Sequence, residues 1–237
     1  MVGRPTGNLR AVSSADTAPL VIAVDGTSGS GKSSTSRCVA DRLGLRYLDT
    51  GAMFRAMTWW LLQEGVDVHD PVSVSALVDR PRLESGTDPV SPTIHVDGLD
   101  VSVAIRSEQV TRAVSPVSAV PAVRARLLQL QRKVIGAGGI VVEGRDIGSV
   151  VWPQAQVKVF LTADPAARAV RRSAEEGGSD VATTRESLLE RDRIDSGRAT
   201  APLTMADDAV HLDTTAYSLD EVVGQIVALV ESVEDQE

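Results

Sequence analysis

Several residue types are scarce in this chain of 237 residues, and each scarcity excludes a class of protein. The single cysteine, Cys38, excludes an internal disulfide and a metal site built from cysteines. His69, His95 and His211 lie far apart and lack the spacing of metal ligands. No apolar run approaches the ~20 residues of a membrane span, and the polar N-terminal stretch lacks the apolar segment of a secretory signal. We therefore expect a cytoplasmic protein with no membrane partner.

Positive charge is also in short supply, because the formal net charge is −8 and the pI is about 5.0. A nucleic-acid backbone is bound by clustered positive charge, so nucleic acid is not expected as a primary partner. A small phosphorylated substrate needs only a few well-placed arginines and stays open. Hydrophobic residues make up 43% of the chain, which is enough for a core. We expect residues 1–18 to form a disordered leader and, with no apolar stripe left over, the protein to be a monomer.

The segment GTSGSGKS at residues 26–33 matches the phosphate-binding pattern GxxxxGK(S/T) at every fixed position. In such a loop the backbone N–H groups surround phosphates, the lysine reaches the β and γ oxygens, and the last hydroxyl ligates Mg²⁺. An expected strand at 20–24 precedes the loop and an expected helix at 34–43 follows it. A flexible Gly/Ser turn is the alternative, but strand, loop and helix N-terminus together favour a phosphate site. The residues expected to contact the nucleotide are Gly26, Thr27, Ser28, Gly29, Ser30, Gly31, Lys32, Ser33 and Ser34.

Short apolar segments alternate with helical patterns along most of the chain, which predicts an α/β fold with a five-stranded parallel sheet between two helical layers. Strands are expected at 20–24, 45–49, 140–142, 157–161 and 209–213, and helices at 34–43, 52–64, 121–135, 165–176, 184–196 and 218–233.

Residues 77–118 interrupt this alternation. Prolines and a glycine separate short alternating pieces at 82–87, 93–96 and 99–105, which predicts a small antiparallel sheet. We therefore expect an inserted subdomain at 77–118 within a core formed by 19–76 and 119–237.

Two polar segments directly follow expected strands, where ligands bind in open parallel sheets. In the first, Thr50 and Arg55 lie five residues apart at the start of a helix. In the second, Glu143, Arg145 and Asp146 project into the same crevice. The alternatives are a helix cap at Thr50 with a surface Arg55, and a structural ion pair in the turn after Glu143.

Arginines in the last third of the chain favour an anion-binding lid at about residues 165–200. Arg191, Asp195 and Arg198 share one face of an expected helix, as a surface ion-pair ladder or as a substrate clamp. Arg168 and Arg172 lie at i and i+4, where like charges repel unless an anion lies between them. A solvated helix is the alternative for this second pair.

These segments together resemble the bacterial cytidylate kinases, which are P-loop nucleoside monophosphate kinases. The matching pieces are the GTSGSGKS loop, YLDTGAMFRA at 47–56, IRS at 105–107, VEGRDIGSVVWP at 142–153 and ERDRIDSGRATAPL at 190–203. They are spread in order from residue 20 to about 230. The resemblance implies a five-stranded parallel core with a lid and an enlarged monophosphate-binding region. It also implies phosphorylation of CMP and dCMP from ATP with Mg²⁺ as cofactor.

The resemblance further implies a role for each matching residue. Thr50 and Asp146 would bind the cytosine edge with Arg124 and Ser115 nearby, Arg55 and Arg145 the monophosphate, and Asp195 the ribose with Arg198 beside it. Lys32, Arg145 and Arg191 would be catalytic, helped by lid arginines such as Arg168 or Arg172. Ser33 would ligate Mg²⁺, with Asp25 or Glu143 acting through water.

Phe54, Thr27 and Trp152 depart from the usual family residues, and none of these changes removes a charged group. Arg193 and Ile194 fill a stretch where some members carry another arginine, so the arginine set around the transferred phosphoryl group stays open. Three other functions are compatible with a phosphate loop: an adenylate or shikimate kinase, a GTPase-type switch and an inactive binding module. The base-reading segments disfavour the first, the missing Asn-Lys-x-Asp disfavours the second, and the intact phosphate-handling residues disfavour the third.

Overall fold

The computed structural model describes residues 20–175, 177–198 and 200–234, so the expected leader at 1–18 lies outside the described residues. A five-stranded parallel sheet forms its centre, in the order β2-β6-β1-β7-β8. The predicted parallel sheet is confirmed, with boundaries shifted by one or two residues. The strands are β1 (Val21–Gly26), β2 (Arg46–Asp49), β6 (Ile140–Glu143), β7 (Val157–Thr162) and β8 (Val210–Asp213).

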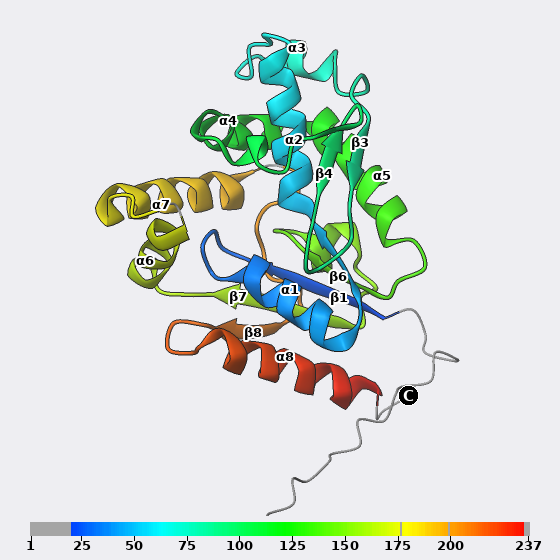
Figure 1. Cartoon of the computed structure of the whole chain (residues 1–237), viewed down its shortest axis with the longest axis vertical. Helices are drawn as coiled ribbons and strands as arrows, with labels where there is room; N and C mark the ends of the chain where they lie inside the picture. Colours follow the sequence, from blue (N-terminus) through cyan, green and yellow to red (C-terminus); the bar gives the residue numbers. More distant parts are fainter. Residues whose placement is uncertain (1–19, 176, 199, 235–237) are drawn as a thin grey trace, which may run out of the picture.

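Helices cover both faces of the sheet, which explains why β1 is apolar at consecutive positions. Ile22 and Val24 pack with α1 (Lys32–Leu43) and α8 (Leu219–Glu234) on one face. Val21 and Ala23 pack on the other face with α2 (Thr50–Gln63) and α5 (Pro121–Ile135). Figure 1 shows the sheet between these two layers. Within the described residues, no helix is long and apolar enough to cross a membrane.

A small three-stranded antiparallel sheet, of β3 (Leu83–Ser85), β4 (Ile94–Val96) and β5 (Leu99–Asp100), lies between α2 and α5 in sequence. The predicted antiparallel sheet is confirmed, but its last strand ends at Asp100 and not at Ile105. The 3₁₀ turn η1 (Ala104–Arg106) follows instead.

Two helices in this part of the chain were not predicted: α3 (Pro71–Ser75) and α4 (Glu108–Ala119). In α4, Val110, Ala113, Val114 and Val117 are buried at helical spacing. The Ser107 hydroxyl caps the helix by accepting a hydrogen bond from the Val110 N–H. The surrounding prolines and short strands hid this pattern, and Pro116 lies inside the helix itself.

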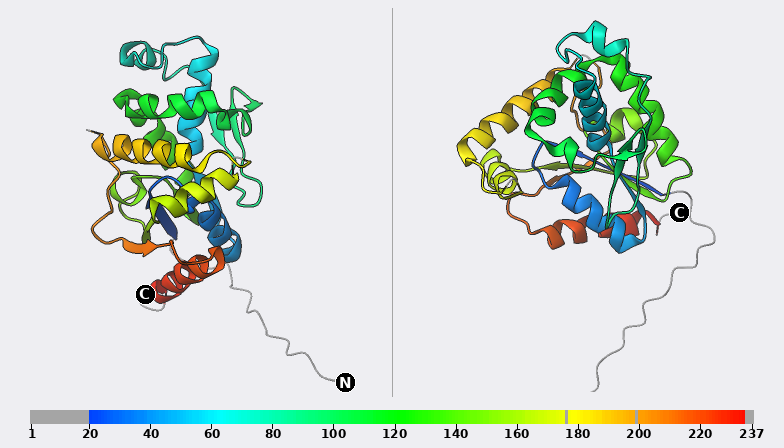
Figure 2. Two further views of the ribbon diagram at one scale, coloured as in Figure 1. Left: turned by 90° about the vertical axis from the view of Figure 1, so that its left-hand side faces the viewer. Right: turned by 45° about the horizontal axis from the view of Figure 1, so that its top comes forward.

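Two further helices, α6 (Pro165–Glu175) and α7 (Val181–Gly197), pack on each other beyond the carboxyl end of β7. Figures 1 and 2 show α7 between α4 and α6. Helix α7 belongs to the expected lid region, and it therefore brings this region into contact with α4 of the expected inserted subdomain.

The α5 helix offers a test of the packing that supports the site. Leu127 is fully buried in the cluster beneath α2, whereas Gln129 on the same helix is exposed. We expect Leu127→Ala to lower the free energy of unfolding by about 3 kcal/mol, because it removes buried methyl groups and leaves a cavity. Urea denaturation measures the change, and Gln129→Ala is the control, expected within about 0.5 kcal/mol of wild type. A loss of under about 1 kcal/mol for Leu127→Ala would contradict the packing described.

Candidate active site

The phosphate-binding motif lies between the end of β1 and the start of α1, as the sequence predicts. Gly26 has φ 144°, and a Cβ at this position would lie 2.0 Å from the Leu161 carbonyl oxygen. Gly29 has φ 77°, and a Cβ there would lie 3.3 Å from Arg168. Glycine is therefore required for the loop to turn beside β7 and beneath α6. The loop ends at the N-terminus of α1, where backbone N–H groups favour anions.

Lys32 is buried at the base of this loop, and its Nζ donates to the Thr27 carbonyl at 2.6 Å. Burial lowers the pKa of the Lys32 ammonium group, and the positive charge of Arg145 lowers it further. Phosphate oxygens in the loop would favour the charged form of the lysine. The lysine is thus held where it would meet the phosphates that the motif predicts.

A buried carboxylate meets the hydroxyl that ends the motif. The Ser33 Oγ donates to Glu143 Oε2 at 3.0 Å, and the Tyr47 hydroxyl donates to the other oxygen of Glu143. Burial raises the pKa of Glu143, and the nearby charge of Asp49 raises it further. A carboxyl group and the hydroxyl of the motif are therefore adjacent, and both are oxygen groups that could bind a magnesium ion or its water.

Asp25, the other carboxylate expected beside a metal, has a different set of partners. Its two oxygens accept hydrogen bonds from the N–H groups of Ile147 and Gly148, both at 2.8 Å. Burial raises the pKa of Asp25 to about 6 in spite of these two hydrogen bonds. Asp25 thus holds the single π-helical turn η2 (Ile147–Val151) that follows the Arg145–Asp146 segment.

The Thr50 and Arg55 side chains bridge the core and the helices above it. Asp49, not Thr50, caps α2, because its carboxylate accepts from the Ala52 N–H at 2.9 Å. The Thr50 Oγ1 instead donates to the Glu143 carbonyl at 2.7 Å. Arg55 donates to the Ile105 carbonyl at 3.2 Å and to Thr111 Oγ1 at 3.0 Å. The alternative of a helix cap with a solvated arginine is therefore wrong on both counts.

A buried ion pair joins α5 to the segment after β6. Arg124 Nη2 and Asp146 Oδ2 are 2.5 Å apart, and each side chain is 8% exposed. The Arg124 guanidinium also lies 5.3 Å from the centre of the Phe54 ring. Ser115 is buried on α4 close by, and its carbonyl accepts from the Ser118 hydroxyl at 2.9 Å. A carboxylate, a guanidinium and an aromatic ring thus gather around one position.

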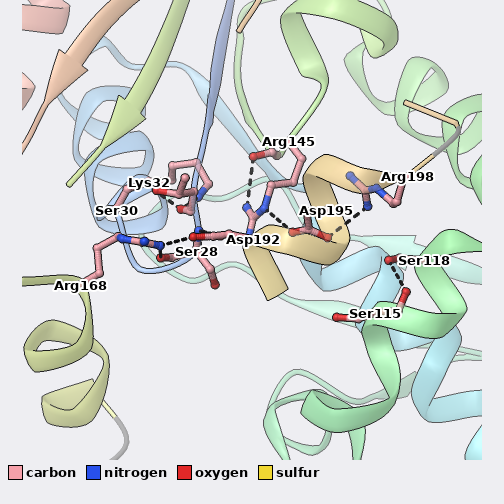
Figure 3. A network of polar contacts seen from close by, with 12 residues as sticks. Ser28, Ser30, Lys32, Ser115, Ser118, Arg145, Arg168, Asp192, Asp195 and Arg198 are labelled. Atoms are coloured by element: carbon pink, nitrogen blue, oxygen red, sulfur yellow. Dashed lines mark hydrogen bonds and ion pairs between the residues drawn. The ribbon is translucent and has the colours of Figure 1, made fainter. Parts of the chain in front are cut away.

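Helix α7 brings a second carboxylate between two arginines. Arg145 Nε donates to Asp195 Oδ2 at 3.0 Å, and Arg198 Nη1 lies 3.4 Å from Asp195 Oδ1. Figure 3 shows Asp195 between Arg145 and Arg198. Buried nitrogens of Arg191 and Arg198 have no hydrogen-bond partner among the residues described. These nitrogens are available to an anion.

The two candidate arginines of α6, Arg168 and Arg172, lie in different surroundings. Arg168 Nη1 donates to the Ser28 carbonyl at 2.9 Å and pairs with Asp192 of α7. Arg172 Nη1 lies 3.2 Å from Glu175 on its own helix. Arg168 is thus directed into the phosphate loop, and Asp192, which was not a candidate in the sequence, joins it there.

Several arginines lie close enough to alter one another's charge. Burial lowers the pKa of Arg55 to about 9, and the charges of Arg191 and Arg172 lower it further. Burial lowers the pKa of Arg191 to about 10, with Arg145 adding to the effect. A bound anion would relieve this repulsion. The cluster next to Lys32 is therefore suited to a second phosphate beside the first.

The sequence of this chain is similar to those of known proteins over most of its length. The profile of the family described as cytidylate kinase matches residues 22–232. The chain belongs to this family. Cytidylate kinase from Streptomyces coelicolor is 58% identical over 220 residues, which cover 92% of this chain and 95% of the relative. Cytidylate kinase from Streptomyces avermitilis is 56% identical over 214 residues, covering 90% and 93% of the two chains.

One solved structure supports the fold alone. The crystal structure of an uncharacterised protein from Eubacterium ventriosum superposes with a TM-score of 0.50 at 12% identity. The match covers 90% of this chain and 99% of that chain.

The structure brings several of the predicted residues into contact, among them Ser33 with Glu143 and Arg145 with Asp195. Tyr47 and Asp192 contact candidate residues and are not among those that the sequence predicts. Tyr47 reads in the sequence as a core residue of a strand, and only its hydroxyl reaches Glu143. Asp192 lies outside the face of α7 that Arg191 and Asp195 share, so helical spacing does not select it. Its position inside the matching segment 190–203 was the available signal.

Proposed function

We propose that this protein transfers the γ-phosphoryl group of ATP–Mg²⁺ to CMP and dCMP, giving ADP with CDP or dCDP by direct in-line transfer. The observation that carries the proposal is the position of Arg145 and Asp146. These residues follow β6, the strand beside β1. They would therefore supply a second anion site and a base reader next to the phosphate loop. Membership of the cytidylate kinase family supports the same reaction.

The donor half of the site consists of the phosphate loop and its ion. Lys32 and the backbone N–H groups of residues 26–34 would hold the β- and γ-phosphates. Magnesium is held by one or two protein oxygens together with phosphates and water. The Ser33 hydroxyl and Glu143, 3.0 Å apart, fit that requirement. Among the described residues there is no cluster of three or more His, Cys, Asp or Glu side chains that could hold a metal ion.

The acceptor half would read the base through Asp146 and Arg124. Cytosine presents an amino donor at N4, which a carboxylate accepts, next to acceptors that an arginine satisfies. Asp146 and Arg124 offer this pair of groups side by side, with Thr50 and Ser115 nearby. The ion pair therefore supports a preference for cytosine over bases that carry an acceptor at the same position.

The remaining residues would hold the sugar and the phosphates. Arg55 and Arg145 bind the monophosphate, and Asp195 binds the ribose with Arg198 beside it. Arg191 neutralises charge on the phosphoryl group during transfer, helped by Arg168 or Arg172. No covalent nucleophile is needed, because positioning and charge neutralisation supply the catalysis. We also infer that residues 165–200 act as a lid that excludes water and residues 77–118 as an inserted subdomain, in a monomer acting in the cytoplasm.

The test is the release of ADP, measured in a coupled assay with a panel of monophosphates. We expect CMP and dCMP to be phosphorylated, and kcat/KM for dTMP to be at least about 10²-fold lower, because thymine presents a carbonyl oxygen to the Asp146 carboxylate where cytosine presents an amino group. AMP completes the panel because family membership predicts that it is a poor substrate. The same mixture without a monophosphate serves as the control for hydrolysis of ATP. Comparable rates with AMP or dTMP and none with CMP would refute the proposal.

A further inference from the structure

Both backbone groups of Ser28 in the phosphate loop are bound by side chains from the two lid helices. The Ser28 N–H donates to Asp192 Oδ1 of α7 at 3.0 Å. The Ser28 carbonyl accepts from Arg168 Nη1 of α6 at 2.9 Å, and Arg168 also pairs with Asp192. Figure 3 shows these three residues beside Lys32. We call this closed set of three contacts the Ser28 clamp.

The packing at the clamp is close on both sides. Gly29 has no side chain, and a Cβ there would lie 3.3 Å from Arg168 and 3.5 Å from Leu188 Cδ1 of α7. Both helices therefore rest directly on the loop. Because Asp192 is adjacent to Arg191 in sequence, the position of Arg191 depends on how α7 is seated.

The clamp contains one negative charge, on Asp192, and one positive charge, on Arg168. Asp192 is a carboxylate held against a loop that would receive a polyphosphate, so alone it would repel that ligand. Arg168 lies against it, and the two side chains are only 5% and 15% exposed. An ion pair of this kind leaves a poorly compensated charge when one partner is removed.

We propose that Asp192 and Arg168 are positioning residues that act through Ser28, with Asp192 seating α7 on the phosphate loop and Arg168 cancelling the Asp192 charge. The inference deepens the proposed function, on which it rests for the identity of the nucleotide. It differs from the role that the resemblance implies for Arg168, which is a direct contact with the transferring phosphoryl group. The two roles predict different behaviour when both residues are changed.

The experiment is a double-mutant cycle on the dissociation constant of ATP, measured by calorimetry without CMP. We expect Arg168→Met to weaken ATP binding about 10²-fold, because the Asp192 charge is left facing the phosphates. Asp192→Asn keeps an oxygen for the Ser28 N–H and should bind ATP within about threefold of wild type. The double variant should recover at least about tenfold of the affinity lost in Arg168→Met. A double variant as weak as Arg168→Met would overturn the proposal and support direct phosphate contact.

A second readout separates seating of α7 from charge. Asp192→Ala leaves the Ser28 N–H without its acceptor, so kcat should fall about tenfold or more while KM for ATP changes little. A kcat equal to wild type would contradict the seating role. Glu190→Gln is the matched control on α7, since Glu190 pairs with Arg193 at the exposed surface, and it should leave both constants unchanged.

A third variant, Arg168→Lys, keeps the positive charge and should bind ATP within about fivefold of wild type. A loss of ATP affinity as large as that of Arg168→Met would contradict charge cancellation. ATP binding without CMP does not depend on the acceptor, so wild-type protein that binds ATP but leaves CMP unchanged would refute the proposed function and leave this inference standing.

Discussion

Replacing Lys32 by alanine is expected to lower kcat for CMP phosphorylation by about 10³-fold or more. The ammonium group is the one lysine charge in the phosphate loop, and charge stabilisation of this kind supplies a large part of phosphoryl-transfer catalysis. The folded protein should survive the change. Burial lowers the pKa of Lys32, so the folded state binds this proton less tightly than the unfolded chain does. Steady-state kinetics gives kcat, and thermal unfolding without nucleotide checks the fold.

The sign of this stability effect follows from the direction of the pKa shift. A lysine whose pKa is lowered on folding opposes folding at pH values where the unfolded chain carries its proton, so removing it relieves that opposition. Loss of the lysine's packing lowers the melting temperature of the variant, and relief of the buried charge raises it. We therefore expect Lys32→Ala to melt close to the wild-type temperature. Lys133→Ala is the control, because Lys133 is an exposed lysine near the end of α5. A Lys32→Ala protein with wild-type kcat would contradict the site assignment.

Replacing Arg145 by alanine is expected to lower kcat/KM for CMP by about 10³-fold while leaving ATP binding within about fivefold. Arg145 follows β6 and donates to Asp195, so we expect its guanidinium to bind the acceptor phosphate. Losing a charge-assisted, bidentate phosphate contact removes both affinity and transition-state stabilisation. Asp195 keeps Arg198 as a partner 3.4 Å away, so the change does not leave a buried carboxylate unpaired. Initial-rate kinetics with CMP and calorimetry with ATP measure the two effects.

The effects of Arg145→Ala on CMP and on ATP are expected to differ. An equal loss of ATP and CMP affinity would indicate a general disturbance of the loop, and an unchanged kcat/KM for CMP would remove Arg145 from the acceptor site. Arg82→Ala is the matched control, because Arg82 is an exposed arginine of the inserted region that pairs with Glu84. It should leave both measurements at the wild-type value.

The strands and the phosphate loop were predictable because their signals are local. A strand buried on both faces is apolar at consecutive positions, and β1 shows this pattern next to the glycine loop. The antiparallel insert was recognised from alternation and turn residues. Helix α4 was missed because its apolar spacing lies among prolines and short strands, where the local signals conflict.

The candidate site was predictable as a set of residues but not as a set of pairs. Asp25 and Glu143 both qualified as carboxylates beside a metal, and their sequence contexts do not separate them. The fold turns Asp25 toward the N–H groups of Ile147 and Gly148, and Glu143 toward Ser33. The expectation that Arg168 faces an anion did not include Asp192, which lies 24 positions away and pairs with it.

The sequence by itself determined the phosphate loop, the parallel α/β core and the family, because these depend on spacing within short segments and on the order of those segments. Only the tertiary structure decided which charges meet. Ser33 and Glu143 are 110 positions apart, and Ser28 and Asp192 are 164 positions apart. Contacts at such separations exist only after the sheet has brought the carboxyl ends of β1 and β6 together and α7 has packed over the loop. The Ser28 clamp is therefore a property of the folded chain and not of any segment of it.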